Sequence, residues 1–444
     1  MMTMMTMMRL VCALALTLVV AGADTGAAAA PGYDGPAILP LRDRKPVMDA
    51  WVKLRLERIV PEEMRRYGFD MWLVICNESV EDPVFRALVP EDPWAVRRLG
   101  MLVFFDRGPQ AGVERVLVAY HAKEFYTKDW DGEKETQWEA LARVVRQRNP
   151  KRIGINQAVK IPYGDGLTAG LKQKLVAALG PDLAARLQPA EELAVAVLER
   201  RLPEELTVYE HVVAIAKAII HEGFSSKVIT PDVTTIDDLN WWFNQRVVDL
   251  GLERWFSNST SLIRAESRGV KDRIIRRGDV IHCDVGIKYL GLHTDTQELA
   301  YVLREGETDA PAGLKEALKK GNRMQDILMG EFRAGRLGNE VQAAALVKGR
   351  AEGLKPRVYT HPIGLHGHAA GAFVGLPDRQ GGVPEKGEYP IHAETAYSIE
   401  LSVNVPIPEW GGQEIRAGIE QEAFFDGQSM RFIGGRQTAF HIVR

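Results

Sequence analysis

The sequence predicts a two-domain protein in which an α/β domain precedes an α+β domain. Its 444 residues exceed what one hydrophobic core usually serves. From about residue 45, short apolar runs alternate with stretches of helical spacing, which indicates a central sheet flanked by helices. After about residue 199, helices and strands instead occur in blocks, which is typical of an α+β domain.

The first residues are typical of a secretory signal peptide. Arg9 supplies a positive flank, residues 10–20 (LVCALALTLVV) form an apolar run, and Ala21-Gly22-Ala23 is a small-x-small cleavage pattern. We therefore expect residues 1–23 to be removed on export to the periplasm or the cell exterior, with residues 24–40 as a flexible lead-in. The alternative is a retained membrane anchor, but eleven apolar residues are fewer than the about 20 that span a bilayer.

Composition and charge are those of an ordinary soluble globular protein, with 46% hydrophobic and 26% charged residues. The net charge is −3 and no long run carries one sign. We therefore expect neither nucleic acid nor, after signal cleavage, a membrane as a partner. Cys12 belongs to the predicted signal, whereas Cys76 and Cys283 lie in apolar runs of different predicted domains. This favours two buried free thiols over a disulfide.

The two predicted domains are residues 41–195 and 196–444. Hydrophobic periodicity places helices at 44–67 and 135–148 and strands at 71–76, 101–105, 116–120 and 152–156 of the first domain. In the second domain Pro203 and two following acids begin a long helix, as helix N-termini prefer. Further helices are expected at 236–250, 312–333 and 338–352, and strands at 279–286, 293–303, 396–403 and 415–425.

Two aspartates stand in apolar, β-branched segments, where lone acids are disfavoured. Asp284 and Asp295 flank a loop at 288–291. In a hairpin centred between Tyr289 and Leu290 they face each other at about 5 Å between Cβ atoms. Such a pair is unfavourable unless a cation lies between the carboxylates. The alternative is a different register, with one aspartate serving as a turn or cap.

Two glutamates repeat this arrangement. Glu400 and Glu420 are each flanked by apolar residues, and their midpoint falls in the turn at 409–412, so a second hairpin opposes two carboxylates. Glu422 competes with Glu420 for the role, because residues two apart share a strand face. Histidines lie between the two pairs: the segment THPIGLHGHAAG holds His361, His366 and His368. This density favours ligation over packing, although His366 remains unassigned.

Four carboxylates and one imidazole form a mostly hard ligand set, suited to Mn²⁺, Fe²⁺, Co²⁺ or Zn²⁺. One ion does not need so many acids. Two ions that share bridging carboxylates neutralise the charge and together lower the pKa of a bridging water. We therefore predict two divalent metal ions, of which manganese, cobalt and zinc are the candidates, bound by Asp284, Asp295, His361, Glu400 and Glu420.

The order Asp, Asp, His, Glu, Glu resembles that of the pita-bread metallopeptidases, which include methionine aminopeptidase, proline aminopeptidase and prolidase, with the metal-free creatinase as a relative. The eleven-residue step from Asp284 to Asp295 matches the family, as does the seven-residue step from His361 to His368 around Gly364. The resemblance covers about residues 200–435. It implies a pita-bread catalytic domain, and the preceding domain is similar in size and pattern to that of prolidase and creatinase.

The resemblance also implies roles for the ligands. Asp284 would chelate one ion, His361 and Glu400 would hold the other, and Asp295 and Glu420 would bridge the two.

Two further roles concern catalysis. His368 would hydrogen-bond the substrate carbonyl or the developing oxyanion. Glu400 would also take the proton of the attacking water.

The sequence departs from the family at the substrate wall. Peptidase members carry a histidine about seventeen residues before the first aspartate, where this chain has Glu266 or Ser267. We expect Glu266 to act there, by binding an amine or relaying a proton, although an ionised carboxylate cannot donate. Leu401 replaces the usual proline after the first glutamate, and Ala369 replaces the acid after the second histidine. The metal ligands themselves are all retained.

The resemblance implies a metallopeptidase of the Xaa-Pro dipeptidase or aminopeptidase kind, which cleaves Xaa-Pro or similar amide bonds by a metal-bound hydroxide. The predicted signal peptide implies that this enzyme is exported. We expect a small peptide as substrate and a homodimer as the assembly. Two alternatives remain at this point: a creatinase-like hydrolase of a non-peptide C–N bond, and a non-catalytic binding module of the same fold.

Overall fold

The computed structural model of the protein describes residues 33–92 and 94–444, and residues 35–444 form one unit. The predicted signal peptide and most of the predicted lead-in lie outside the described residues. Among the helices that are described, none combines the length and the apolar character needed to cross a membrane.

A six-stranded sheet with the order β4-β3-β2-β1-β5-β6 forms the centre of the N-terminal region. β1 pairs antiparallel with β2 and parallel with β5, which gives the mixed α/β sheet expected from the alternating pattern. The strands are β1 (Met71–Asn77), β2 (Leu99–Asp106), β3 (Val113–Ala119), β4 (Thr127–Lys128), β5 (Ile153–Ile155) and β6 (Leu187–Pro189).

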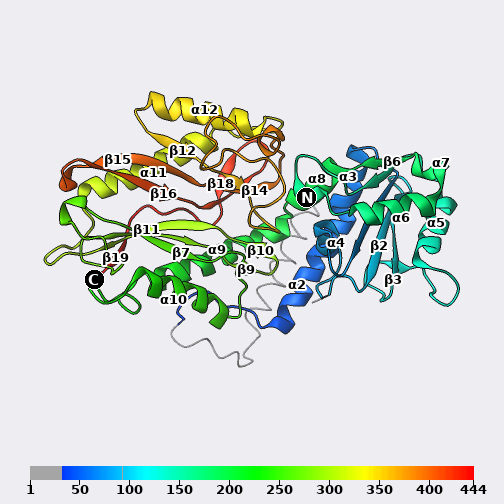
Figure 1. The fold of residues 1–444 in the computed structure, drawn as a ribbon, viewed down its shortest axis with the longest axis horizontal. Coiled ribbons are helices and arrows are strands. Elements are labelled where there is room, and N and C mark those ends of the chain that lie inside the picture. Colours follow the sequence, from blue (N-terminus) through cyan, green and yellow to red (C-terminus); the bar gives the residue numbers. More distant parts are fainter. Residues whose placement is uncertain (1–32, 93) are drawn as a thin grey trace, which may run out of the picture. The chain divides into compact units, whose positions relative to one another are not determined.

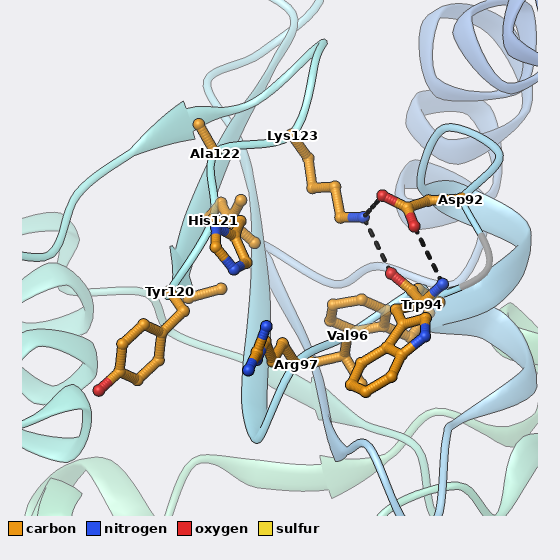
Figure 2. Close-up of a pocket in the computed structure, with 12 residues that line it drawn as sticks. Asp92, Trp94, Val96, Arg97, Tyr120, His121, Ala122 and Lys123 are labelled. Atoms are coloured by element: carbon orange, nitrogen blue, oxygen red, sulfur yellow. Dashed lines mark hydrogen bonds and ion pairs between the residues drawn. The ribbon is translucent and has the colours of Figure 1, made fainter.

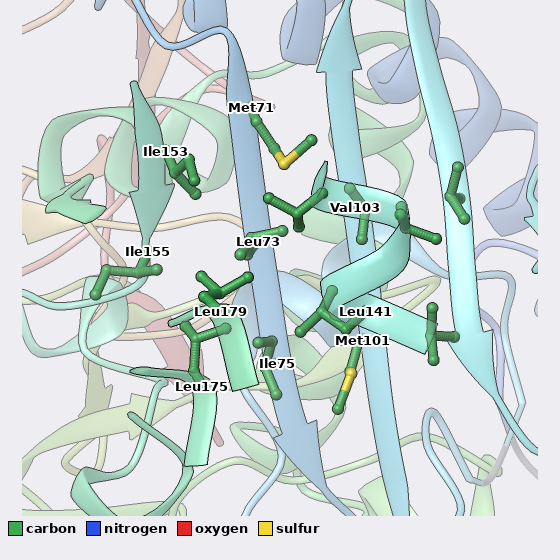
Figure 3. Close-up of a cluster of buried hydrophobic side chains, with 14 of the residues drawn as sticks. Met71, Leu73, Ile75, Met101, Val103, Leu141, Ile153, Ile155, Leu175 and Leu179 are labelled. Carbon is green, nitrogen blue, oxygen red and sulfur yellow. The ribbon is translucent and has the colours of Figure 1, made fainter. Parts of the chain in front are cut away.

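Helices cover this sheet. Apolar side chains of β1, β2 and β5 pack against two of these helices, α5 and α6, and form one buried cluster (Figure 3). α5 begins with a capping box between Thr136 and Glu139, which satisfies N–H groups that the first turn leaves unpaired. The helices are α2 (Leu41–Leu54), α3 (Val60–Arg66), α4 (Pro83–Leu88), α5 (Gln137–Arg148), α6 (Ala169–Leu179), α7 (Pro181–Ala184) and α8 (Glu191–Glu199); η2 (Pro162–Gly164) is a 3₁₀ turn.

Two boundaries differ from the sequence prediction. The helix expected at 44–67 begins at Leu41 and includes a π-helical turn, η1 (Arg55–Ile59), between α2 and α3. The domain division expected at 195/196 falls inside α8, whose residues 193–199 are all buried.

The C-terminal region contains the grouped helices and strands that the sequence predicts. α11 packs on β15 and β16, whereas α10 packs on β7, and Figure 1 shows α12 and α10 on opposite sides of the strands. The helices are α9 (Pro203–Gly223), α10 (Ile236–Asp249), α11 (Ala312–Met329) and α12 (Gly338–Ala351), with 3₁₀ turns η3 (Glu266–Arg268), η4 (Lys386–Glu388) and η5 (Pro408–Trp410).

The strands of this region form three larger sheets with the orders β19-β11-β8-β7, β12-β15-β16 and β13-β14-β17-β18, besides the small β9–β10 ladder. They are β7 (Ser259–Ile263), β8 (Val280–Val285), β9 (Lys288–Tyr289), β10 (Leu292–His293), β11 (Thr296–Val302), β12 (Pro356–Val358), β13 (His361–Pro362), β14 (Thr395–Ser398), β15 (Leu401–Ile407), β16 (Gln413–Ile419), β17 (Glu422–Phe425), β18 (Met430–Phe432) and β19 (His441–Val443).

The register of the first hairpin corrects the sequence prediction. Asp284 pairs with Gln297, not with Asp295, so the two aspartates are diagonal neighbours. The reason lies in the turn: Leu290 and Gly291 both have positive φ, 53° and 74°, as a two-residue type I′ turn requires. The centre of the hairpin is therefore one residue later than predicted. Diagonal side chains of a sheet are still close enough to share a ligand.

The second hairpin has the predicted register but not the predicted continuity. Leu401 pairs with Ile419, so the next pair outward in this register is Glu400 with Glu420. The strands expected at 396–403 and 415–425 are each broken at this point. β14 and β17 belong to one sheet, and β15 and β16 belong to another. Both glutamates therefore lie where the chain passes from one sheet to the next.

Cys76 and Cys283 are both buried free thiols, as the sequence predicts. Cys76 lies on β1 of the N-terminal sheet and Cys283 lies on β8, so the two belong to different regions of the fold.

Candidate metal centre

Asp284 and Asp295 come from the β8–β11 hairpin. Asp284 lies near the end of β8, on the strand face that is only half-buried, because the burial pattern of β8 alternates there. Asp295 lies between β10 and β11 and is 5% exposed. Its backbone N–H donates to Glu422 Oε1 at 2.8 Å, and the Thr296 hydroxyl donates to the same oxygen at 3.0 Å. These hydrogen bonds anchor the backbone of Asp295 to the Glu422 carboxylate.

Glu400 and Glu420 come from the two strand breaks. At a break the strand ladder stops, so these residues are not held in the regular alternation of either sheet. Glu420 instead forms an isolated antiparallel bridge with Gln297 of β11. The Ser398 hydroxyl at the end of β14 donates to Glu420 Oε1 at 2.7 Å. The break thus turns Glu420 towards the β8–β11 hairpin.

His361 supplies the imidazole. It begins β13 and pairs with Ser398 of β14. Its Nδ1–H donates to the carbonyl oxygen of Pro362 at 3.0 Å, which leaves Nε2 as the unprotonated nitrogen. Nε2 lies 3.4 Å from Glu420 Oε1 and 3.5 Å from Asp295 Oδ2. The ring is therefore oriented as a ligand, with its lone pair directed at the carboxylates.

The structure brings all five predicted ligands together. Three overlapping groups of side chains each have ligand atoms within 4.8 Å of one another. The groups are Asp284, Asp295 and Glu420; His361, Glu400 and Glu420; and Asp295, His361 and His368. Glu420, and not its competitor Glu422, is the glutamate that takes part.

The electrostatics of the cluster favour a bound cation. Burial raises the pKa of Asp284 to about 6 and the pKa of Glu400 to about 7. For Asp295 and Glu420, burial and then repulsion from the neighbouring carboxylates raise the pKa well above its usual range. Four buried or half-buried carboxylates cannot all be ionised in this space without positive charge between them.

Two unpartnered atoms test whether these residues fit a metal. His361 Nε2 and Asp284 Oδ1 are buried and make no hydrogen bond with the described residues. Buried polar atoms are normally satisfied, so such orphans need an explanation. Here both atoms belong to the same cluster of hard donors, and divalent ions such as Mn²⁺, Co²⁺ or Zn²⁺ would satisfy them. The residues present fit a metal centre.

His368 stands at the edge of the cluster. Its ring lies 4.5 Å from that of His361 and 5.3 Å from that of Trp255, edge to face in both cases. Although its side chain reaches solvent, partial burial and the neighbouring His361 and Lys386 side chains lower the pKa of His368 to about 4. It is therefore neutral near pH 7 and carries one N–H donor.

Sequence reasoning missed three residues around these ligands. The Tyr359 hydroxyl lies 3.1 Å from His368 Nε2, and Trp255 forms a wall beside that ring. Gln297 contacts two of the glutamates. Tyr359 and Gln297 each lie two residues from a predicted ligand, so the two-residue period of strands was the signal that pointed to them. Trp255 is distant in the sequence and offered no such signal.

His366 does not join the cluster. Its ring lies 4.3 Å from that of Tyr163 of η2, tilted by 32°, and stacks on that of His293 at 6.2 Å between centroids. Burial lowers the pKa of His366 to about 3, so it stays neutral. His366 therefore packs the histidine segment THPIGLHGHAAG against the N-terminal region.

Glu266 is a correction. It belongs to η3, beyond the Ile263 end of β7, whereas the opposite end of β7 pairs with Asp284. Its backbone N–H donates to Gln413 Oε1, at the far end of the β15–β16 hairpin. Six residues of strand separate that end from Leu401, a distance of about 20 Å. Neither Glu266 nor Ser267 therefore reaches the carboxylates, because the β7–β8 connection carries them past the end of the sheet.

The variant Glu266→Gln should accordingly keep full activity and full metal content. The exposed side chain contacts no ligand of the cluster, and substitutions of this kind change stability by less than about 0.5 kcal/mol. Steady-state kinetics and metal analysis of the purified variant check this. A clear loss of kcat with metal retained would return Glu266 to the site.

A separate cavity of about 340 Å³ lies in the N-terminal region. Figure 2 shows its lining by Trp94, Arg97, Tyr120 and His121, with the Lys123 ammonium bound to Asp92 and to the Trp94 carbonyl. Its lining includes a single carboxylate, which is already paired with Lys123. It therefore lacks the ligand set of a metal centre.

Comparisons with known proteins agree with this geometry. Residues 208–422 match metallopeptidase family M24. A comparison with the sequences of curated proteins finds no match. The match begins in α9 and ends at Glu422, so it includes all five candidate ligands and His368.

Solved structures are similar over most of the chain. The X-Pro aminopeptidase of Thermotoga maritima has 15% identity and a TM-score of 0.61, covering 86% of this chain and 100% of its own. The Xaa-Pro dipeptidase of Bacillus anthracis has 16% identity and a TM-score of 0.54, covering 88% and 99%. The prolidase of Pyrococcus horikoshii has 13% identity and a TM-score of 0.53, covering 86% and 99%. The shared fold includes the N-terminal region.

The family match, the similar folds and the clustered ligands lead to one conclusion. The C-terminal region of this chain belongs to metallopeptidase family M24, the pita-bread metallopeptidases, whose enzymes use divalent metal ions.

Proposed function

We propose that the protein is a peptidase that binds two divalent metal ions and cleaves Xaa-Pro or similar amide bonds of small peptides. The observation that carries the proposal is the convergence of four carboxylates and the unpaired His361 Nε2, with the neutral His368 beside them. The printed names of the similar structures, which are X-Pro aminopeptidase, Xaa-Pro dipeptidase and prolidase, support the bond type.

The five candidate ligands have one role in the proposed reaction, which is to bind the metal ions. Asp284, Asp295, His361, Glu400 and Glu420 would hold the ions, which when bound polarise the scissile carbonyl and make water acidic.

Proton transfer and charge stabilisation fall to two side chains. Glu400 takes the proton of the water whose oxygen attacks the carbonyl carbon. It then gives that proton to the departing nitrogen as the C–N bond breaks. His368 donates its N–H to the oxygen on which negative charge develops.

Aromatic side chains support a substrate with a ring or another compact apolar group. Trp255 and Tyr359 are half-buried, and the ring of each lies next to that of His368. Trp255 is held in place because Gly286 and Gly367 leave room for its indole: a Cβ on either glycine would lie within 2.5 Å of it. A proline ring suits such a wall, since it is apolar and conformationally fixed.

Adding Mn²⁺, Co²⁺ or Zn²⁺ to metal-free protein should raise its melting temperature. Ions that bind only the folded state stabilise it by about 2.7 kcal/mol at a hundredfold excess over Kd. They also offset the carboxylate repulsion described above. Thermal unfolding with and without a chelator, together with metal analysis, checks the prediction. A metal content near zero at saturating ion, with an unchanged melting temperature, would overturn the proposal.

Substrate assays separate the proposed activity from its alternatives. Xaa-Pro dipeptides should be hydrolysed, and longer Xaa-Pro peptides distinguish an aminopeptidase from a dipeptidase. A fully metallated protein that cleaves neither, but hydrolyses a non-peptide C–N bond, would be a creatinase-like hydrolase. One that cleaves nothing would be a binding module. Export and a homodimeric assembly stay predictions, which cell fractionation and a solution mass measurement check.

A further inference from the structure

We propose that Gln297 and His282 form a positioning pair that holds Glu400 and Glu420 in the geometry needed to bind metal. The inference rests on the proposed function, because it concerns the same metal centre. Neither residue belongs to the predicted ligand set, and both lie on the β8–β11 hairpin next to it.

The backbone places Gln297 against Glu420. Gln297 pairs with Asp284 across the hairpin, and it also forms an isolated bridge to Glu420. Two backbone hydrogen bonds make that bridge: Gln297 N–H to Glu420 O at 3.0 Å, and Glu420 N–H to Gln297 O at 3.2 Å. Gln297 is only 7% exposed, so its side chain must find its partners inside the site.

A single amide nitrogen holds both glutamates. Gln297 Nε2 lies 2.7 Å from Glu400 Oε1 and 2.7 Å from Glu420 Oε2. An amide nitrogen carries two hydrogens, so each carboxylate receives one. These are charge-assisted bonds, the stronger class. The amide therefore holds together two carboxylates that repel each other. Each oxygen has two lone pairs, so this contact leaves capacity for a metal ion.

His282 determines which way the amide faces. Its Nε2 lies 2.9 Å from Gln297 Oε1. Because the amide oxygen can only accept, the imidazole nitrogen must donate. A reversed amide would place its oxygen against two carboxylates and its NH₂ group against the imidazole N–H, which is unfavourable at both ends. His282 lies two residues before Asp284 on the same strand face, and this position brings it to the amide.

The pair acts on the metal through the ligands. Hydrogen-bonded partners of ligating carboxylates orient them, and losing one typically costs 10- to 100-fold in metal affinity. Since His282 touches neither glutamate directly, its effect must pass through Gln297. The two residues should therefore be coupled, and the coupling is measurable.

The experiment is a metal titration of chelator-treated protein with Co²⁺, followed by calorimetry and by visible absorption of the bound ion. Gln297→Met removes both donors and keeps the side-chain length, and it should weaken Co²⁺ affinity by about 10- to 100-fold. His282→Leu should act in the same direction and more weakly, and His282→Gln, which restores an N–H donor, should recover most of the affinity. Gln342→Met is the matched control, because Gln342 is also buried but its amide donates to the Arg379 backbone carbonyl and to no carboxylate of the cluster.

The double variant shows whether His282 affects the metal only through Gln297. Gln297→Met with His282→Leu should bind Co²⁺ no more weakly than Gln297→Met alone, because His282 acts only through the amide. Additive losses of Co²⁺ affinity in the double variant, or wild-type affinity in either single variant, would overturn the proposed pair. If Gln297→Met fails to fold, the loss of Co²⁺ affinity in His282→Leu and its recovery in His282→Gln still test the proposal. A wild type that binds no metal would instead overturn the proposed function, so the two failures are distinguishable.

Discussion

The Asp295→Asn variant should lose bound metal and peptidase activity together, while its metal-free form unfolds at a higher temperature than the metal-free wild type. Asp295 belongs to two of the three ligand groups, so its loss affects the whole cluster. The loss of activity should exceed the about 10- to 100-fold that removal of an outer hydrogen-bonding partner costs. The opposite effect on stability arises because Asp295 is buried among carboxylates that repel it. An uncharged amide of the same shape removes that repulsion.

Metal analysis, steady-state kinetics and thermal unfolding with and without a chelator measure the three quantities. Asp378→Asn is the matched control, since the Asp378 side chain is 76% exposed and lies outside the cluster. The control should keep metal, activity and melting temperature. A metal-free Asp295→Asn protein that is less stable than the metal-free wild type would show that this carboxylate stabilises the fold, and would contradict the electrostatic argument.

The His368→Ala variant should keep its metal and lose about 10²- to 10³-fold in kcat. This is the loss expected when one donor to a developing oxyanion is removed. His368 stands at the solvent side of the cluster, and the other five candidate ligands remain in the variant. Because the interaction forms in the transition state, kcat and kcat/KM should fall in parallel.

His121→Ala is the control for this variant, since it removes an exposed histidine of the N-terminal region. It should leave the kinetics unchanged. If His368→Ala instead loses metal, His368 is a ligand together with Asp295 and His361, and the catalytic donor must be sought elsewhere. The nearest group is the Tyr359 hydroxyl, which lies 3.1 Å from His368 Nε2.

The sequence by itself determined the candidate ligands, because acids are costly inside apolar strands. Asp284, Asp295, Glu400 and Glu420 each stand out against β-branched or apolar neighbours, and a dense histidine segment lies between the pairs. It also determined the α/β and α+β pattern, because hydrophobic periodicity is a local property of the chain. The Glu400–Glu420 register followed from the position of one turn.

Only the tertiary structure decided the rest, because it depends on contacts between segments distant in the sequence. The turn at Leu290 and Gly291 moves the hairpin centre by one residue, so Asp284 pairs with Gln297 instead of Asp295, which no strand pattern reveals. The breaks at Glu400 and Glu420 arise because neighbouring residues pair in different sheets. Spacing along the chain placed Glu266 at the site, but the β7–β8 connection carries it away. The contact of Gln297 with both glutamates likewise exists only once three sheets meet, because periodicity predicts a face and not the partner that covers it.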